Sequence, residues 1–249
     1  NLDTNISSNL GEFYASANAL STSPSSSSAR ARYLSAAGTI ANQFQELNMH
    51  FDNMTKGLND SMSGMVADVN MMSKQLAEIN NSKDSGSNEL LDQQEVLLNR
   101  LAQIVSIQAI RSENGKVDVF MSNGQPLVIK GSAHEIAAFR SLDDPEFPEI
   151  GAVQKDGSVR QLSDNAITGG EIAGLLTFRK DALYAARNEL GRMAMTFANA
   201  ANEFQKMGQT SAGTQGTDMY FYEDPTVFNY GANAGDGKLS ATISDMGAV

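Results

Sequence analysis

Apolar residues recur at alternating steps of three and four between Tyr33 and Ile79, and this pattern constrains the fold more than any other feature of the chain. The repeating positions are Ala37, Ile40, Phe44, Leu47, Phe51, Met54, Leu58, Met62, Met65, Val69, Met72, Leu76 and Ile79. Such spacing keeps one face of an α-helix apolar and is typical of a coiled-coil seam. A helix of this extent would be roughly 70 Å long at about 1.5 Å per residue. Because Gly57 weakens a helix interior, the sequence leaves open whether the helix over 29–79 is continuous or breaks there.

Helical sequence flanks this seam on both sides. Before it, apolar residues from Leu2 to Leu20 have helical spacing, and Pro24 with its serine neighbours is predicted to end that helix in a short loop. After it, the segment 80–88 is rich in Asn, Ser and Gly and is predicted to be a loop, and helical sequence resumes over 89–105. Short connections make neighbouring helices antiparallel, so these three helices predict a bundle.

After Val105 the apolar pattern changes to a period of two, which indicates β-strands. Val117, Val119 and Met121 share one face of a predicted strand. Three dipeptides supply the positive φ angles that tight hairpins need: Asn114-Gly115, Asn123-Gly124 and Asp156-Gly157. Further strands are predicted over 127–129, 152–154 and 159–162, with an irregular acidic loop over 143–149. Together these segments predict a small antiparallel β subdomain.

A second long helix is predicted between Gly170 and Gly208, where glycine is placed to end it. Its apolar seam is predicted at Ile172, Leu176, Leu183, Ala186, Leu190, Met193, Phe197, Ala200, Phe204 and Met207. Downstream, glycines alternate with aromatic residues, which indicates the start of a β-rich domain. The predicted class is therefore α+β: a long antiparallel, coiled-coil-like bundle with an inserted antiparallel β subdomain and the beginning of a second domain. The predicted divisions are helices over 1–106, the β insertion over 107–168, the returning helix over 169–208 and the outer domain over 209–249.

The composition excludes several classes of function. The chain has 29 acidic and 18 basic residues, and its basic residues are scattered, so it lacks a stripe that could neutralise nucleic-acid phosphates, and an anionic membrane would repel it. It has no cysteine, which excludes disulfides, thiolate metal sites and a cysteine nucleophile. No apolar run approaches the roughly 20 residues that span a bilayer. Asn1 opens directly into helical sequence without a signal-peptide pattern or an initiator Met, so we expect a fragment of a longer protein.

No catalytic, cofactor or metal site is predicted. The two histidines, His50 and His134, are not accompanied by a nucleophile on a constrained turn. The acidic residues Asp143, Asp144, Glu146 and Glu149 could offer oxygen ligands to Ca²⁺, but they lack the spacing and the central Gly of a known calcium loop. A solvated loop is the preferred interpretation of that run, and the protein is not expected to be an enzyme.

Three stretches of the chain carry a resemblance to a known family. They are the helix-loop-helix around Phe13 and Pro24, the stretch from Asn88 to Gln94, and the stretch from Gly170 to Arg179 and on to Gly191. Together they resemble the flagellar hook-associated proteins of the hook-filament junction, the FlgK family, whose Asn-x-Leu-Leu-Asp-Gln-Arg stretch is similar to residues 88–94 with Gln94 in place of Arg. After the third stretch, Asn202 and Gly208 keep the family's spacing, while Phe204-Gln205 stands where the family usually has Gln-His.

The resemblance implies an extracellular structural subunit of the bacterial flagellum, exported by the flagellar type III apparatus without a cleavable signal. It implies self-association into a ring or helical lattice between hook and filament, contact with hook protein and with the adjacent junction protein or flagellin, and an export chaperone in the cytoplasm. It also implies that the terminal segments that fold on assembly are absent here, so that this piece should stay monomeric. The candidate packing and assembly residues are Arg179, Asp92, Phe178, Arg187 and Asn188.

Arg179 interrupts the seam of the returning helix, and two interpretations stay open. It either bridges to an acidic residue such as Asp92 on a neighbouring helix or contacts an adjacent subunit. Two alternatives to the junction role also stay open. One is flagellin or another flagellar axial protein, and the other is a surface adhesin or binding module on a helical stalk.

Overall fold

A computed structural model describes residues 2–140, 146–163, 167–210, 212–222 and 243–246 of the chain. Their contacts form two compact units: unit 1 comprises Asn1–Asn53 and Tyr184–Val249, and unit 2 comprises Met54–Leu183. Long helices and small antiparallel sheets make up these units, which confirms the predicted α+β class. The finer domain division at residues 106, 168 and 208 stays a prediction.

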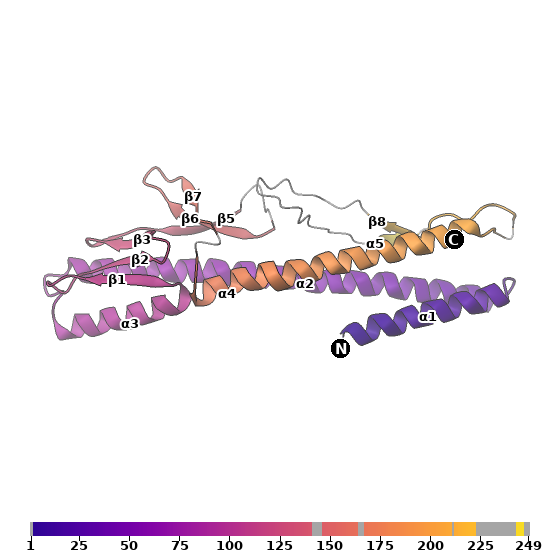
Figure 1. Cartoon of the computed structure of the whole chain (residues 1–249), viewed down its shortest axis with the longest axis horizontal. Coiled ribbons are helices and arrows are strands. Elements are labelled where there is room, and N and C mark those ends of the chain that lie inside the picture. The colour runs from indigo at the N-terminus through magenta and orange to yellow at the C-terminus, as the bar shows by residue number, and fades with distance from the viewer. Residues whose placement is uncertain (1, 141–145, 164–166, 211, 223–242, 247–249) are drawn as a thin grey trace. The chain divides into compact units, whose positions relative to one another are not determined.

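The helices account for most of the described chain (Figure 1). They are α1 (Leu2–Thr22), α2 (Ser27–Asn81), α3 (Asn88–Ile104), α4 (Gly170–Phe178), the π-helical turn η2 (Arg179–Leu183) and α5 (Tyr184–Met207). The helix α2 runs without a break past Gly57, which resolves the question that the sequence left open. It begins earlier than predicted because the Ser26 hydroxyl accepts the backbone N–H of Ala29 at 3.2 Å and so caps the first turn.

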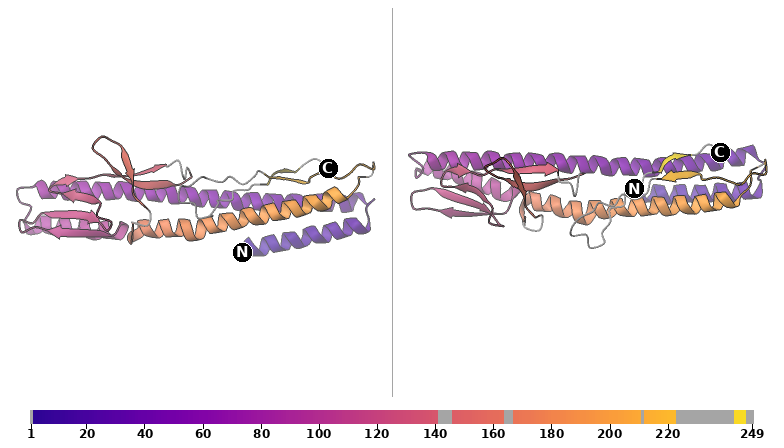
Figure 2. Two further views of the ribbon diagram at one scale, coloured as in Figure 1. Left: turned by 45° about the horizontal axis from the view of Figure 1, so that its top comes forward. Right: turned by 90° about the horizontal axis from the view of Figure 1, so that it is seen from above.

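Unit 1 packs α1, the N-terminal part of α2 and α5 side by side (Figure 2). Aromatic rings fill the space between them, with the ring centroids of Phe13 and Phe197 at 5.3 Å and those of Phe197 and Tyr220 at 5.3 Å. A surface ion pair between Arg32 and Glu12, at 2.8 Å, also joins α2 to α1. Because such exposed pairs contribute little, the apolar contacts are the main stabilising term in this unit.

Unit 2 packs the C-terminal part of α2, together with α3 and α4, against antiparallel strands. One sheet has the order β1-β2-β3-β4, formed by β1 (Ile107–Arg111), β2 (Val117–Met121), β3 (Pro126–Ile129) and β4 (Ser132–Ala133). The other has the order β5-β6-β7, formed by β5 (Ile136–Arg140), β6 (Pro148–Val153) and β7 (Val159–Gln161). A two-stranded sheet in unit 1 pairs β8 (Tyr220–Tyr222) with β9 (Ile243–Met246). Strands β1, β4 and β5 were not predicted, because they lack a clear apolar alternation.

The predicted hairpin glycines have the expected conformation. Gly115, Gly124 and Gly157 have φ of +78°, +82° and +83°. Strand β2 buries Val117, Val119 and Met121 on one face, as its alternation predicted. The local turn chemistry and the period of two therefore predicted this part of the sheet correctly.

The prediction of a solvated acidic loop was wrong at its C-terminal end. Glu149 lies in β6 and is only 6% exposed, because β6 is the central strand between β5 and β7. Asp143 and Asp144 lie outside the described residues. The acidic residues of 143–149 favour a loop in the sequence, whereas the apolar residues that follow them form a strand. Ile150 and Ala152 on that strand are fully buried.

Asparagine side chains on α2 form hydrogen bonds with strands of unit 2 and with the segments next to them. Asn59, Asn70 and Asn81 are spaced by 11 residues, about three helical turns, so they lie on one face of α2. Their amides donate to the carbonyls of Glu146, Ile136 and Gly131, each at 2.8 Å. The buried Asn80 amide donates to the Val117 carbonyl at 2.7 Å, and its Oδ1 accepts the Val117 N–H at 2.9 Å. Asn80 and Asn81 stay helical, against the loop prediction, because the Asn80 side chain bonds to β2 and the Asn81 side chain to the turn at Gly131, and neither bonds to its own backbone.

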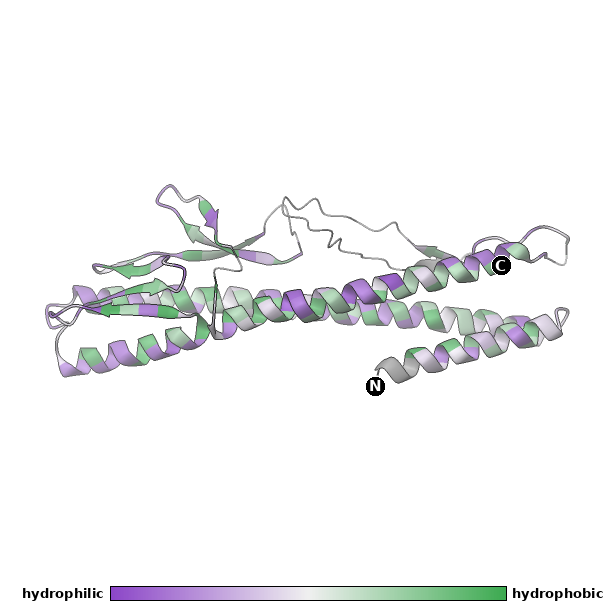
Figure 3. Ribbon diagram, in the orientation of Figure 1, coloured by the Kyte–Doolittle hydropathy of each residue, from purple (hydrophilic) through white to green (hydrophobic). Residues whose placement is uncertain are grey.

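The seam predicted on α2 forms the core on which both units are built. Val69 and Leu76 are fully buried and Met72 is 1% exposed in unit 2, and Ala37, Ile40 and Phe44 are buried in unit 1. Hydrophobic and hydrophilic residues are interleaved along these helices (Figure 3). The burial of these seam residues in both units confirms the predicted apolar seam on α2.

The seam predicted on α5 was displaced by one residue over its C-terminal half. Met193, Phe204 and Met207 are 42%, 74% and 76% exposed, and the buried positions there are Ala194, Ala198, Ala201 and Asn202. Small residues line this face because α1 and α2 present the bulky Phe13, Ile40 and Phe44 to it. A pattern search that follows large apolar side chains therefore selects the wrong face of this helix.

A matched pair of substitutions tests which face of α5 is buried. Ala198→Leu is expected to lower the free energy of unfolding by about 1–3 kcal/mol, because Ala198 is fully buried and the added carbons overpack the core. Ala200→Leu places the same side chain on the exposed face and should change stability by less than about 0.5 kcal/mol. Urea denaturation followed by circular dichroism measures both. Equal costs for the two variants would contradict the assigned face.

Candidate assembly surface

Arg179 is buried inside unit 2. It lies in the π-helical turn and is 9% exposed, and its Nη1 donates to the Pro148 carbonyl at 3.3 Å. Its guanidinium carbon lies 5.5 Å from the centroid of the Phe147 ring, within the range of a cation–π contact. The structure therefore gives Arg179 partners on the segment that leads into β6, and the predicted ion pair with Asp92 is not formed between these two described residues.

Asp92 lies instead on the rim of an open groove between α2 and α3. The groove has a volume of about 520 Å³. Ile79, Val96 and Leu97 supply its apolar part, while Glu78 and Asp92 make the rim acidic. Val96 is 68% exposed. We call this feature the α2–α3 groove.

The remaining candidates are distributed over both units. Phe178, at the end of α4, is 41% exposed. In unit 1, the Arg187 guanidinium pairs with the Asp52 carboxylate at 3.0 Å, and its side chain is 13% exposed. Asn188 lies next to it on α5 and is half-buried. The predicted residues thus belong to two different units, and their role in assembly stays a prediction.

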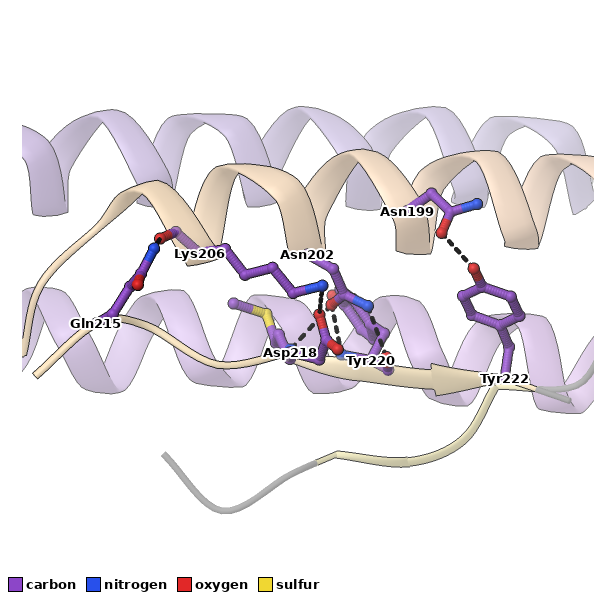
Figure 4. A network of polar contacts seen from close by, with 8 residues as sticks. Asn199, Asn202, Lys206, Gln215, Asp218, Tyr220 and Tyr222 are labelled. Atoms are coloured by element: carbon purple, nitrogen blue, oxygen red, sulfur yellow. Dashed lines mark hydrogen bonds and ion pairs between the residues drawn. The ribbon is translucent and has the colours of Figure 1, made fainter.

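A buried amide on α5 holds the segment that follows the helix. Asn202 Oδ1 accepts the backbone N–H groups of Met219 and Tyr220, both at 2.9 Å, and its Nδ2 donates to the Tyr220 carbonyl at 2.8 Å (Figure 4). The Asn202 amide thus forms with this segment the kind of hydrogen bonds that the backbone of a neighbouring β-strand would form. Between α5 and this segment the chain passes close to the helix end at Gly216. A side chain is not tolerated there, because a Cβ would lie 2.0 Å from the Gln205 carbonyl oxygen. We call the contacts of Asn202 with Met219 and Tyr220 the α5 clamp.

Further polar contacts surround the α5 clamp. The Tyr220 hydroxyl donates to the Ala37 carbonyl of α2 at 3.1 Å, and burial raises the pKa of this phenol far above its usual value, so it stays a neutral donor. Lys206 pairs with Asp218 at 2.8 Å, and this contact raises the pKa of the Lys206 ammonium. Tyr222 donates to the Asn199 amide oxygen at the exposed edge (Figure 4). In the sequence, Asn202 keeps the family's spacing, but its role is not predicted. The signal for that role is a polar residue on a helix face that otherwise carries small apolar residues.

The outer face of α5 carries an apolar stripe. Its members are Ala186, Met193, Ala200, Phe204 and Met207, at steps of seven, seven, four and three. This spacing places them on one face of the helix, where all of them are exposed and where the exposed Glu189 and Glu203 also lie. We call this row the α5 stripe. Another face of α5 is packed in the core of unit 1, so this helix has a buried face of small residues and an exposed face on which large apolar and acidic residues are mixed.

The described part of the chain offers little for other kinds of site. Within it, no group of three or more His, Asp or Glu side chains is arranged to hold a metal ion. None of its described helices is long and apolar enough to cross a membrane. The packing surfaces are therefore the strongest functional candidates.

Comparison with known proteins identifies relatives over almost the whole chain. The family model described as the flagellar hook-associated protein FlgK helical domain matches residues 1–220. Flagellar hook-associated protein 1 of Escherichia coli K12 is 28% identical over 254 aligned residues, which cover 99% of this chain and 46% of the relative. The protein of the same name from Salmonella typhimurium is 29% identical over 96% of this chain and 44% of its own length.

A solved structure has the same fold. The flagellar hook junction protein FlgK from Burkholderia pseudomallei matches with a TM-score of 0.86 and 28% sequence identity, over 92% of this chain and 43% of that protein. The chain thus spans less than half the length of the relatives it matches. The matched family region ends at residue 220, inside the segment that the α5 clamp holds.

Proposed function

Because this chain belongs to the FlgK family of flagellar hook-associated proteins, we propose that it is part of a structural subunit that joins the flagellar hook to the filament. The observation that carries the proposal is the match of the family's helical domain over residues 1–220, together with a shared fold at a TM-score of 0.86. The role is mechanical and not catalytic. The proposed location is the flagellum, outside the cell.

The helix α5 supports a role in assembly. Its Met193, Phe204 and Met207 side chains are exposed, and large exposed apolar side chains mark sites where a partner binds, as subunits of an axial structure bind one another. The proposed partners are like subunits, hook protein, and the adjacent junction protein or flagellin. Before assembly, a cytoplasmic chaperone would shield the subunit, and the type III apparatus would export it without a cleavable signal.

Complementation tests the proposed function. The full-length gene, expressed in a flagellated strain that lacks its own junction protein, is expected to restore filaments attached to hooks, counted by electron microscopy. The strain's own junction gene and an empty plasmid are the positive and negative controls. Hooks without filaments, with flagellin released unpolymerised into the medium although the protein is expressed and exported, would refute the junction role.

A further inference from the structure

Three hairpin tips in unit 2 share one backbone geometry. In each, the N–H of a glycine with positive φ donates to the carbonyl three residues earlier: Gly115 to Ser112 at 3.1 Å, Gly124 to Met121 at 2.8 Å and Gly157 to Gln154 at 2.9 Å. The residues before these glycines are Asn114, Asn123 and Asp156, and each side-chain Oδ1 accepts the backbone N–H two residues further on. An asparagine before a glycine is chemically labile, because glycine has no side chain and leaves its backbone nitrogen open to approach.

We propose that Asn123 is a site of spontaneous deamidation, at which its side-chain amide becomes a carboxylate, and that the fold protects Asn114 from the same reaction. The backbone nitrogen of Gly124 gives up its proton and attacks Cγ of Asn123. The bond between Cγ and the amide nitrogen breaks, ammonia leaves with a proton, and a cyclic imide forms. Water then opens one of the two imide carbonyls and gives aspartate or isoaspartate. The reaction consumes one water, releases one ammonia and transfers no electrons.

The tip that joins β2 to β3 can open without disturbing the core of unit 2 (Figure 1). Asn123 and Gly124 are exposed, and in the described structure a Cβ built on Gly124 would meet nothing within 4 Å beyond its chain neighbours. Two hydrogen bonds flank the tip on exposed side chains, one between Ser122 and Thr168 at 3.1 Å and one from Arg160 to Gln125 at 2.8 Å. The Gly124 N–H must leave the Met121 carbonyl before its nitrogen can react, and local opening costs least where contacts are few and exposed.

The tip that joins β1 to β2 is docked on its neighbours in unit 2. Ser85 Oγ donates to the Asn114 carbonyl at 3.3 Å, and the buried Gln94 amide donates to the Gly115 carbonyl at 3.0 Å. A Cβ on Gly115 would lie 2.8 Å from the Cα of Gly86, so the backbone of the tip packs directly on the loop before α3. Opening this tip breaks bonds to buried side chains, which costs more than opening an exposed tip. Asn114 is therefore expected to react more slowly, although a glycine follows it as well.

Asp156 shows how the turn accepts the product. It occupies the position that aspartate would take at 123, so the β2–β3 tip should keep its shape after conversion to aspartate. Its Oδ1 accepts Ser158 Oγ at 2.6 Å and the Ser158 N–H at 3.0 Å, and these bonds lower the pKa of the Asp156 carboxyl. An ionised carboxylate resists attack by the next backbone nitrogen, so Asp156-Gly157 does not form the imide. The proposed reaction therefore adds one negative charge to an exposed hairpin, and the modified fraction rises with the age of the protein.

Peptide mapping of the folded full-length protein tests the proposal. The protein is incubated at mildly alkaline pH in heavy-oxygen water and digested at acidic pH, so that the isotope marks the carboxylates formed during the incubation. Asn123 should convert at least about tenfold faster than Asn114, a ratio that corresponds to a difference of about 1.4 kcal/mol in local opening. In the same protein unfolded in urea, the two rates should agree within about a factor of two, because glycine follows both asparagines and neither tip is docked.

Two variants test the cause of the difference. Gln94→Ala removes the bond to the Gly115 carbonyl and should raise the rate at Asn114 at least about threefold while leaving the rate at Asn123 unchanged. If circular dichroism shows that this variant does not fold, Ser85→Ala, which removes the bond to the Asn114 carbonyl, decides by the same measure. A smaller ratio between the two sites in the folded protein, or no conversion at Asn123, overturns the proposal. An unchanged rate at Asn114 in the folded variant overturns the protection by docking.

Discussion

Asn202→Ala is expected to release the segment 209–222 from α5 and to lower the free energy of unfolding by about 3 kcal/mol. The substitution removes three hydrogen bonds to Met219 and Tyr220, made at 2.8–2.9 Å by a side chain that is 6% exposed. Each buried backbone group that loses its partner costs about 1–3 kcal/mol, and partial hydration of the released segment reduces the total. Tyr220 then also loses the packing that holds its ring against Phe197.

Hydrogen exchange resolves where this loss occurs. The amides of Met219 and Tyr220 should exchange at least about 100-fold faster in the variant, because their acceptor is gone and a factor of 100 corresponds to about 2.7 kcal/mol of local opening. Asn199→Ala is the matched control on the same helix, since Asn199 is exposed and, among the described residues, its side chain bonds the Tyr222 hydroxyl alone. It should change stability by less than about 1 kcal/mol. Unchanged protection at residues 219 and 220 in Asn202→Ala would show that other contacts hold this segment.

The sequence predicted the fold best where large apolar residues and buried positions coincide. On α2 the bulky seam is the buried seam, so both its period and its burial could be read from the chain. On α5 the large apolar residues and the buried positions do not coincide. Ala194, Ala198 and Ala201 occupy the buried face, because the neighbouring helices contribute the large side chains there. Complementary sizes across a core are a property of the pair of helices, and the pattern of one helix alone does not contain them.

The polar contacts between helix and strand were predicted less well, although a signal for them exists. Asn59, Asn70 and Asn81 repeat every 11 residues within the heptad run, a spacing that keeps them on one helical face. Asparagine is a poor helix former, so its repeated use at this spacing indicates a structural requirement. The backbone carbonyl to which each amide donates lies 50 to 87 residues away in sequence, and local patterns do not specify such distant partners.

The candidate residues show the same limit. Arg179 was singled out because it interrupts an apolar seam, and the structure confirms that it is buried. Its contacts include the Pro148 carbonyl and the Phe147 ring, whereas Asp92, the partner that the sequence favours, lies on the rim of the α2–α3 groove. A charged residue in an apolar pattern thus predicts that a partner exists, but a search among acidic residues overlooks backbone carbonyls and aromatic rings.

Arg179→Met is expected to lower the free energy of unfolding by about 2–4 kcal/mol while keeping most of the side-chain volume. The variant loses a hydrogen bond from a charged donor to the Pro148 carbonyl, worth about 1.5–3 kcal/mol, and a buried contact with the Phe147 ring, worth about 0.5–2 kcal/mol. Lys180→Met makes a similar change at the next position of the same π-helical turn, where the side chain is exposed, and should cost less than about 0.5 kcal/mol. Chemical denaturation of the two purified variants, together with filament counts in the complemented strain, separates the two roles that the sequence left open for Arg179.

Two outcomes distinguish these roles. If Arg179→Met keeps its stability but no longer attaches filaments, the main contact of Arg179 lies in the neighbouring subunit. If its stability falls, and the fall accounts for any loss of attachment, Arg179 acts in the interior of unit 2.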